Sequence, residues 1–76
     1  MINNVYYSYS DKELIEKWGK KLKSLRVEAG FSQTELAEKT GMSRSSIAEI
    51  EKGRNFSIAS LLSISRVLEF LNEFEF

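Results

Sequence analysis

Apolar residues recur at helical spacing along most of this chain. In residues 10–30 the apolar positions are separated by four, four, three and four residues, at Leu14, Trp18, Leu22, Leu25 and Ala29. This spacing places them on one face of an α-helix. Shorter apolar sets follow at Leu36 and Ala37, at Ile47 and Ile50, and in residues 58–68. The pattern predicts an all-α chain.

Serines and glycines mark the predicted helix boundaries. Ser10 and Ser32 each stand three residues before a glutamate, which is the spacing of a capping box. Ser43 and Ser57 are placed as further N-caps, and three glycines fall where helices should end, at Gly30, Gly41 and Gly53. Together with the apolar C-terminal segment, these signals predict a compact five-helix domain.

Three stretches leave questions for the structure. Gly19 lies inside the first helix, where glycine costs ~1 kcal/mol relative to alanine, so it indicates either a close packing contact or a weak point. Residues 58–68 are strongly apolar, and we expect the other helices to pack on this one.

Residues 1–9 have no helical period. We interpret them as an N-terminal arm, either flexible or packed through its tyrosines, which precedes a single domain at 10–76.

Residues 30–55 contain two short helices with a very short connection. Only Gly41 and Met42 separate Thr40 from the cap Ser43. So short a connection forces the helices to cross steeply, and Ala37 is small enough for the point where they touch. The sequence therefore predicts a helix-turn-helix. Its second helix turns a polar face outward, formed by Arg44, Ser45, Ala48, Glu49 and Lys52.

Composition narrows the function classes. The 76 residues suit one small domain, and the chain has no cysteine and no histidine. Thiolate zinc sites, cysteine nucleophiles and histidine bases are thereby excluded, so we expect neither an enzyme nor a bound metal or cofactor. The sequence has no apolar run of about 18 residues and no secretory pattern, and we expect a cytoplasmic protein.

The charge is neutral overall but unevenly distributed. Residues 12–56 contain ten basic and seven acidic residues, whereas residues 57–76 contain one basic and three acidic residues. A nucleic-acid-binding domain is commonly more basic than this. The modest excess around the predicted helix-turn-helix predicts moderate affinity for a polyanion.

The quoted residues carry a resemblance to a known family. Ala37, Gly41 and Ile47 resemble the helix-turn-helix of the lambda-repressor-like, or XRE-type, family, and so does the run LR-x3-GFSQ-x2-LA-x3-G-x-S-x3-I-x2-IE-x-G that begins at Leu25. The similarity covers roughly residues 14–71. It implies a dimer that inserts the third helix of each subunit into successive major grooves of DNA.

The resemblance also implies roles for individual residues. Base edges would be read by Arg44, Ser45 and Glu49, and phosphates would be held by Gln33, Ser43, Arg54 and Asn55. In this family Gln33 often also braces the recognition helix, and Arg26 and Glu51 match an ion pair that joins the first helix to the third. Independently, the planar fork of Arg44 can bond guanine O6 and N7 together. Glu49 would accept from a cytosine amino group, orient Arg44, or remain a solvated acid.

The predicted function is a sequence-specific DNA-binding transcriptional regulator, a dimeric repressor in its leading form. The alternative is a protein-interaction module on the same fold, or an antitoxin that binds a toxin, with weak or secondary DNA binding. The apolar ending either completes the core or contacts another chain; its candidate dimer residues are Phe70, Leu71 and Phe74.

Overall fold

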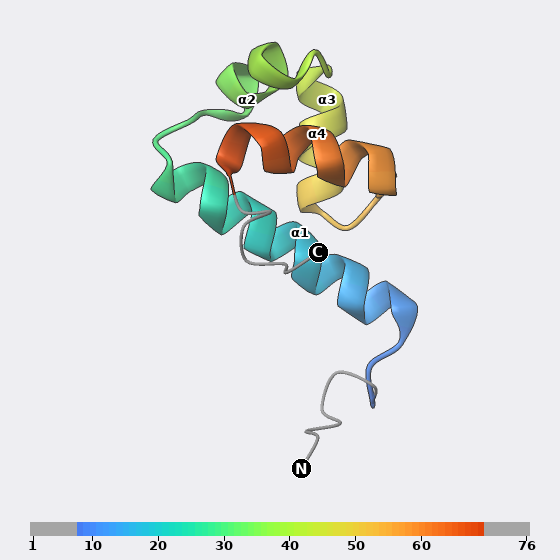
Figure 1. Ribbon diagram of the computed structural model, residues 1–76. Helices are drawn as coiled ribbons and strands as arrows, with labels where there is room; N and C mark the ends of the chain where they lie inside the picture. The colour runs from blue at the N-terminus through green and yellow to red at the C-terminus, as the bar shows by residue number, and fades with distance from the viewer. Residues whose placement is uncertain (1–7, 70–76) are drawn as a thin grey trace.

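Four helices make up the described part of the chain. The computed structural model describes residues 8–69, which form α1 (Asp11–Glu28), α2 (Gln33–Thr40), α3 (Arg44–Glu51) and α4 (Ile58–Leu68). In Figure 1, α1 runs along one side of the molecule and the other three helices gather on the opposite side. The all-α prediction is confirmed, but the expected count of five helices is not: residues 8–69 contain four. Most of the predicted arm, and the apolar segment with Phe70, Leu71 and Phe74, lie outside the described residues.

The predicted caps form as their sequences indicate. The Ser10 and Ser32 hydroxyls accept hydrogen bonds from the backbone N–H groups of Glu13 and Glu35, and each glutamate carboxylate accepts the N–H of its serine. Ser43 and Ser57 cap α3 and α4 through the N–H groups three residues on. Each cap satisfies an N–H that the helix itself leaves without a partner.

The core is small and is drawn from all four helices. Its fully buried apolar side chains are Leu22, Leu36, Ala37, Ile47, Ile50 and Ile64. Leu25, Met42, Phe56, Leu61, Val67 and Leu68 pack around it while partly exposed. Ala29, expected on the inner face of α1, is instead exposed, because it is the C-cap residue beyond the last helical turn.

The expectation that α4 is the central helix is wrong. The extensive contacts join α2 to α3, α1 to α3, and α2 to α4, so α3 lies between α1 and α2. On α4, Ile58 is 72% exposed and Leu62 40% exposed. Apolar residues go most of the way around this helix, and the neighbouring helices cover only the side that carries Ile64 and Ser65.

Gly19 is the site of a close packing contact between α1 and α3. A Cβ atom at this position would lie 2.6 Å from the carbonyl oxygen of Ile50 and 2.7 Å from that of Glu51. Gly53, just after α3, packs closely on α1 as well. A Cβ at this position would lie 2.8 Å from the Cα of Glu16. Because neither glycine carries a side chain, the C-terminal end of α3 rests directly on the backbone of α1.

Tyr9 is the member of the predicted arm whose packing the structure describes. The Lys17 ammonium lies over its ring, 4.6 Å from the centroid. This cation–π contact places Tyr9 against the first turns of α1.

Candidate nucleic-acid interface

The first turn of α3 is an exposed polar surface on a rigidly held helix. Ile47 and Ile50 fix the inner side of α3 in the core, and on the outer side Ser43, Arg44 and Ser45 are exposed. Ser46 is half-buried, and its hydroxyl lies 2.8 Å from that of Ser43, so it belongs to the cap. The side chains free to meet a ligand at this end of α3 are therefore those of Arg44 and Ser45.

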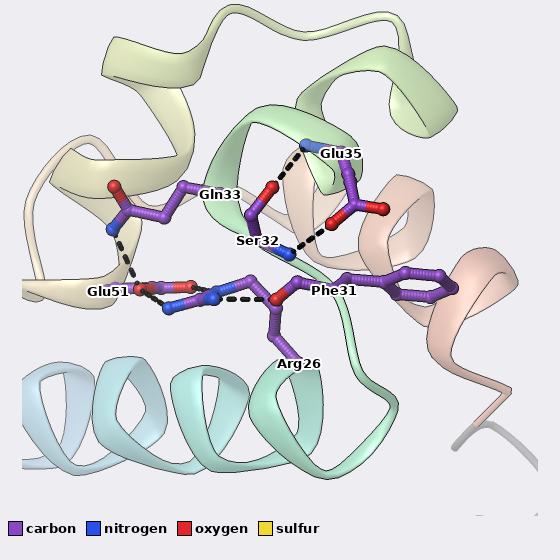
Figure 2. A network of polar contacts seen from close by, with 6 residues as sticks. All are labelled: Arg26, Phe31, Ser32, Gln33, Glu35 and Glu51. Atoms are coloured by element: carbon purple, nitrogen blue, oxygen red, sulfur yellow. Dashed lines mark hydrogen bonds and ion pairs between the residues drawn. The ribbon is translucent and has the colours of Figure 1, made fainter.

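Glu51 is the centre of a polar network that joins three helices (Figure 2). Its Oε2 accepts Arg26 Nε at 2.6 Å, and its Oε1 accepts both Arg26 Nη2 at 3.1 Å and Gln33 Nε2 at 3.0 Å. Arg26 Nη1 also donates to the Phe31 carbonyl at 2.7 Å. One carboxylate at the end of α3 thus receives donors from α1 and from the start of α2.

This network is buried, which makes its hydrogen bonds consequential. The side chains of Arg26 and Glu51 are only 9% and 5% exposed. A buried ion pair is costly to desolvate, and it is retained where its remaining donors and acceptors are also satisfied. Here the fork-to-carboxylate geometry, the Phe31 carbonyl and Gln33 supply those partners. The network fixes how α3 is presented relative to α1 and α2.

Gln33 uses one side-chain N–H in this network, and its second N–H and its carbonyl oxygen can form other hydrogen bonds. A side-chain amide has two N–H donors and one acceptor oxygen, and the hydrogen bond to Glu51 uses one donor. Gln33 is also the first residue of α2, where helix N–H groups point outward and favour an anion. The residue can therefore brace α3 and still offer a donor at the surface.

Glu49 and Arg54 form a second ion pair, on the exposed side of the end of α3. Arg54 Nη1 lies 3.7 Å from Glu49 Oε2, and the two side chains are 68% and 36% exposed. Of the roles predicted for Glu49, orienting Arg44 is not the arrangement seen, because its ion-pair partner within residues 8–69 is Arg54. The signal for this partner was in the sequence, since Gly53 predicts a helix ending that brings these two positions together.

Asn55 has a conformational reason to be asparagine. Its φ is 50°, in the left-handed region, where asparagine is several-fold enriched among non-glycine residues. Asn55 is exposed and follows Arg54 directly. Its side chain therefore extends the polar surface beyond the end of α3, while its backbone turns the chain toward α4.

The capping box at the start of α2 lowers the pKa of its glutamate. Hydrogen bonding from the Ser32 backbone N–H, and then from the Ser32 side chain, lowers the pKa of Glu35 below the usual 4.5. The same arrangement with Ser10 lowers the pKa of Glu13. Both carboxylates are therefore held in their charged form at the positive ends of their helices.

The described residues also bear on metal binding and on membrane insertion. Residues 8–69 contain no cluster of acidic side chains arranged to hold a metal ion. None of the four helices in this part of the chain combines the length and the apolar character that crossing a bilayer requires.

Comparison with known proteins points the same way as the geometry. A family model described as helix-turn-helix matches residues 22–76. A Pyrococcus horikoshii protein described as an HTH-type transcriptional regulatory protein is 49% identical over 55 residues, which cover 72% of this chain and 17% of the relative. The HTH-type transcriptional regulators SinR of Bacillus subtilis and Bacillus licheniformis are 42% identical over 53 residues, covering 67% of this chain and 48% of each relative. The chain thus spans less than half the length of these curated relatives.

Proposed function

This chain belongs to the XRE-type helix-turn-helix family, and we propose that it is a sequence-specific DNA-binding transcriptional regulator. The observation that carries the proposal is the presentation of α3: a helix fixed by a buried core and a buried ion pair, with Arg44 and Ser45 exposed on its first turn. Such a helix enters the major groove with its N-terminal residues toward the base edges. A regulator of this kind acts in the cytoplasm, where it meets DNA.

Arg44 is the proposed principal base reader. Its guanidinium can donate two hydrogen bonds to guanine O6 and N7, which is worth about 1–3 kcal/mol of discrimination against another base. Ser45 is small enough to let α3 approach the groove and can donate to a base edge. Glu49 faces the groove one turn further on, where it can accept from a cytosine amino group.

Phosphates on either side of the groove are the proposed ligands of four further residues. Ser43 would donate through its backbone N–H at the start of α3, and Gln33 through the side-chain N–H that Glu51 does not use. Beyond α3, Arg54 and Asn55 would hold the opposite phosphate strand. These contacts set register and orientation, and they carry no sequence information themselves.

The test is a selection of duplexes from a random-sequence library, followed by binding measurements over a range of salt concentrations. We expect a preferred duplex whose affinity falls steeply as salt rises. Arg44→Ala should lose most of the preference for that duplex. Asn55→Gly, which keeps the left-handed backbone and removes the amide, should weaken preferred and random duplexes alike.

The alternative on the same fold is a protein-interaction module or a toxin-binding antitoxin. The net charge of zero and the Glu49 carboxylate on the outer face of α3 favour it. It predicts that no duplex is preferred over random DNA even at low salt, and that Arg44→Ala leaves DNA affinity unchanged. That result would end the DNA-reading proposal.

A further inference from the structure

The end of α3 brings Glu49 and Arg54 together through its backbone. The Arg54 N–H donates to the Glu49 carbonyl at 2.8 Å, and the Gly53 N–H donates to the Ile50 carbonyl at 2.9 Å. With Gly53 at φ 80°, these two bonds constitute a Schellman motif. In this motif the residue three positions before the C-cap Lys52 and the residue two positions after it, Glu49 and Arg54, become neighbours. A hydrophobic contact commonly fills that place, whereas here it is an ion pair.

This motif also packs against α1. Gly53 is pressed against the α1 backbone at Glu16, so the turn that carries Arg54 cannot move away from α3 without losing that contact. Glu49 therefore stays within reach of the Arg54 guanidinium for as long as α3 is folded. The separation of 3.7 Å is longer than a hydrogen bond, so attraction between the charges holds the two side chains together.

Chemically, the Glu49 carboxylate can pair with Arg54 as a phosphate would. Both are anionic oxygen groups that accept from a guanidinium, and Arg54 is the arginine that lies beyond the end of α3. A phosphate that approaches Arg54 competes with Glu49 for the charge of its guanidinium. A displaced carboxylate is then left beside the DNA, where phosphates repel it unless a base supplies a donor.

We propose that Glu49 is a specificity-determining residue that occupies Arg54 in place of phosphate and thereby weakens binding to DNA of arbitrary sequence. On a preferred duplex, a base donor in the major groove satisfies Glu49 and frees Arg54 for the backbone. On other duplexes no such donor replaces the guanidinium, and the ion pair persists. This inference rests on the proposed function for its DNA step, whereas the competition for Arg54 needs only a phosphate polymer.

The first test uses inorganic polyphosphate, which has no bases. Binding is measured over a range of salt concentrations for the full chain, Glu49→Gln, Arg54→Gln and the double variant. Because exposed ion pairs are weak, Glu49→Gln should tighten binding by about two- to fivefold. It should also steepen the salt dependence, because one more cationic side chain then releases counter-ions from the polyphosphate. In the Arg54→Gln background, the same substitution should have a clearly smaller effect on both quantities, because only the direct repulsion between the carboxylate and phosphates remains to be relieved.

Glu28→Gln is the matched control, because it removes the same charge from an exposed glutamate at the far end of α1. It should leave polyphosphate binding close to that of the unmodified chain. Equal effects of Glu28→Gln and Glu49→Gln would overturn the inference, since they would reflect net charge alone. An effect of Glu49→Gln that is as large in the Arg54→Gln background would also overturn it, because the carboxylate would then act without Arg54.

The second test compares a selected duplex with random duplexes. Glu49→Gln should raise affinity for random duplexes more than for the selected one, so the ratio of the two affinities falls by at least about twofold. An unchanged or increased ratio contradicts the specificity role. If the unmodified chain prefers no duplex, the proposed function fails, and the polyphosphate measurement still decides whether Glu49 competes for Arg54.

Discussion

Glu51 is the single residue whose removal should disturb this molecule most. Its carboxylate accepts three hydrogen bonds and is the partner of Arg26, which is itself buried. Glu51→Ala would leave the guanidinium buried with only the Phe31 carbonyl as acceptor. We expect the free energy of unfolding to fall by about 3 kcal/mol or more, because a buried charge without its counter-ion is strongly unfavourable. In a domain of this size the melting temperature should fall by at least about 10 °C.

Glu49→Ala is a close control for that measurement. It makes the same substitution two residues earlier on the same helix, in an ion pair whose side chains are 68% and 36% exposed. An exposed pair contributes ~1 kcal/mol or less, so this melting temperature should change little. A Glu51→Ala melting temperature within a degree or two of the unmodified chain would show that the buried pair does not stabilise the fold.

Gly19 gives a second prediction at the residue scale, and its sign is informative. Alanine in a helix interior is normally better than glycine by about 1 kcal/mol. Here the added methyl would meet two carbonyl groups of α3 at distances no real contact allows. Gly19→Ala should therefore destabilise the fold by about 1–3 kcal/mol, measured by urea unfolding. Lys20→Ala, at the next and exposed position, should be neutral or slightly stabilising.

Gly19 and Glu49 show why single residues were harder to interpret than elements. From the sequence, Gly19 was either a close contact or a weak point, because the carbonyls it meets lie more than 30 positions away in the chain. The sequence offers Arg44 as a residue that Glu49 could orient, whereas the ion-pair partner in the structure is Arg54. The spacing to Gly53 contains that answer, but only once the helix ending is recognised as a Schellman motif.

At the scale of elements, the two capping boxes predict how stability depends on pH. Their hydrogen bonds lower the pKa values of Glu13 and Glu35 in the folded chain, compared with an ordinary 4.5. A carboxyl group with a lowered folded-state pKa stabilises the fold fully above its unfolded-state pKa. That contribution disappears as pH falls through the lowered value. Stability should therefore decrease as the solution is acidified below about pH 5.

Glu35→Gln isolates one of these groups. Glutamine can still accept the Ser32 N–H in a capping box but does not titrate. Urea midpoints measured from pH 6 down to pH 3 should fall less steeply for Glu35→Gln than for the unmodified chain. Glu38→Gln removes a charge from the same helix outside the box and should keep the steeper profile. Identical acid profiles for all three proteins would contradict a role for the cap.

Helix boundaries were predictable because their causes are local. A serine three residues before a glutamate, or a glycine after the last apolar position, fixes a cap within one turn of chain. The relative placement of the helices was less accessible. Residues 58–68 are apolar on most sides, so periodicity could not reveal that Ile58 and Leu62 stay exposed or that α3 is the helix between α1 and α2.

At the scale of the whole molecule, a single copy can make only a limited number of contacts with DNA. The chain has no net charge, and α3 is 8 residues long, with the side chains proposed to read bases confined to one face. Two copies would double the contacts and convert the second binding event into an intramolecular one. A dimer with its α3 helices about 34 Å apart would read two half-sites on one face of the duplex.

The predicted dimer contact through Phe70, Leu71 and Phe74 rests on sequence, since these residues lie outside the described range. We expect Phe74→Asp to convert a dimer into a species with the mass of the 8.8 kDa chain in sedimentation equilibrium. Affinity for a selected duplex with two half-sites should fall, while affinity for a single half-site should not, because each copy keeps its own α3. A Phe74→Asp protein that sediments as the unmodified chain does would place the contact elsewhere.

Ile58→Asp is the informative companion, because Ile58 is an apolar residue that the structure does show exposed, on α4. Both variants replace an apolar side chain with the same charge, so a general effect of added charge would appear in both. If the C-terminal segment forms the contact, Ile58→Asp remains dimeric and binds the two-half-site duplex as the unmodified chain does. Dissociation by Ile58→Asp alone would assign the contact to the uncovered side of α4, where Ile58 and Leu62 lie one turn apart.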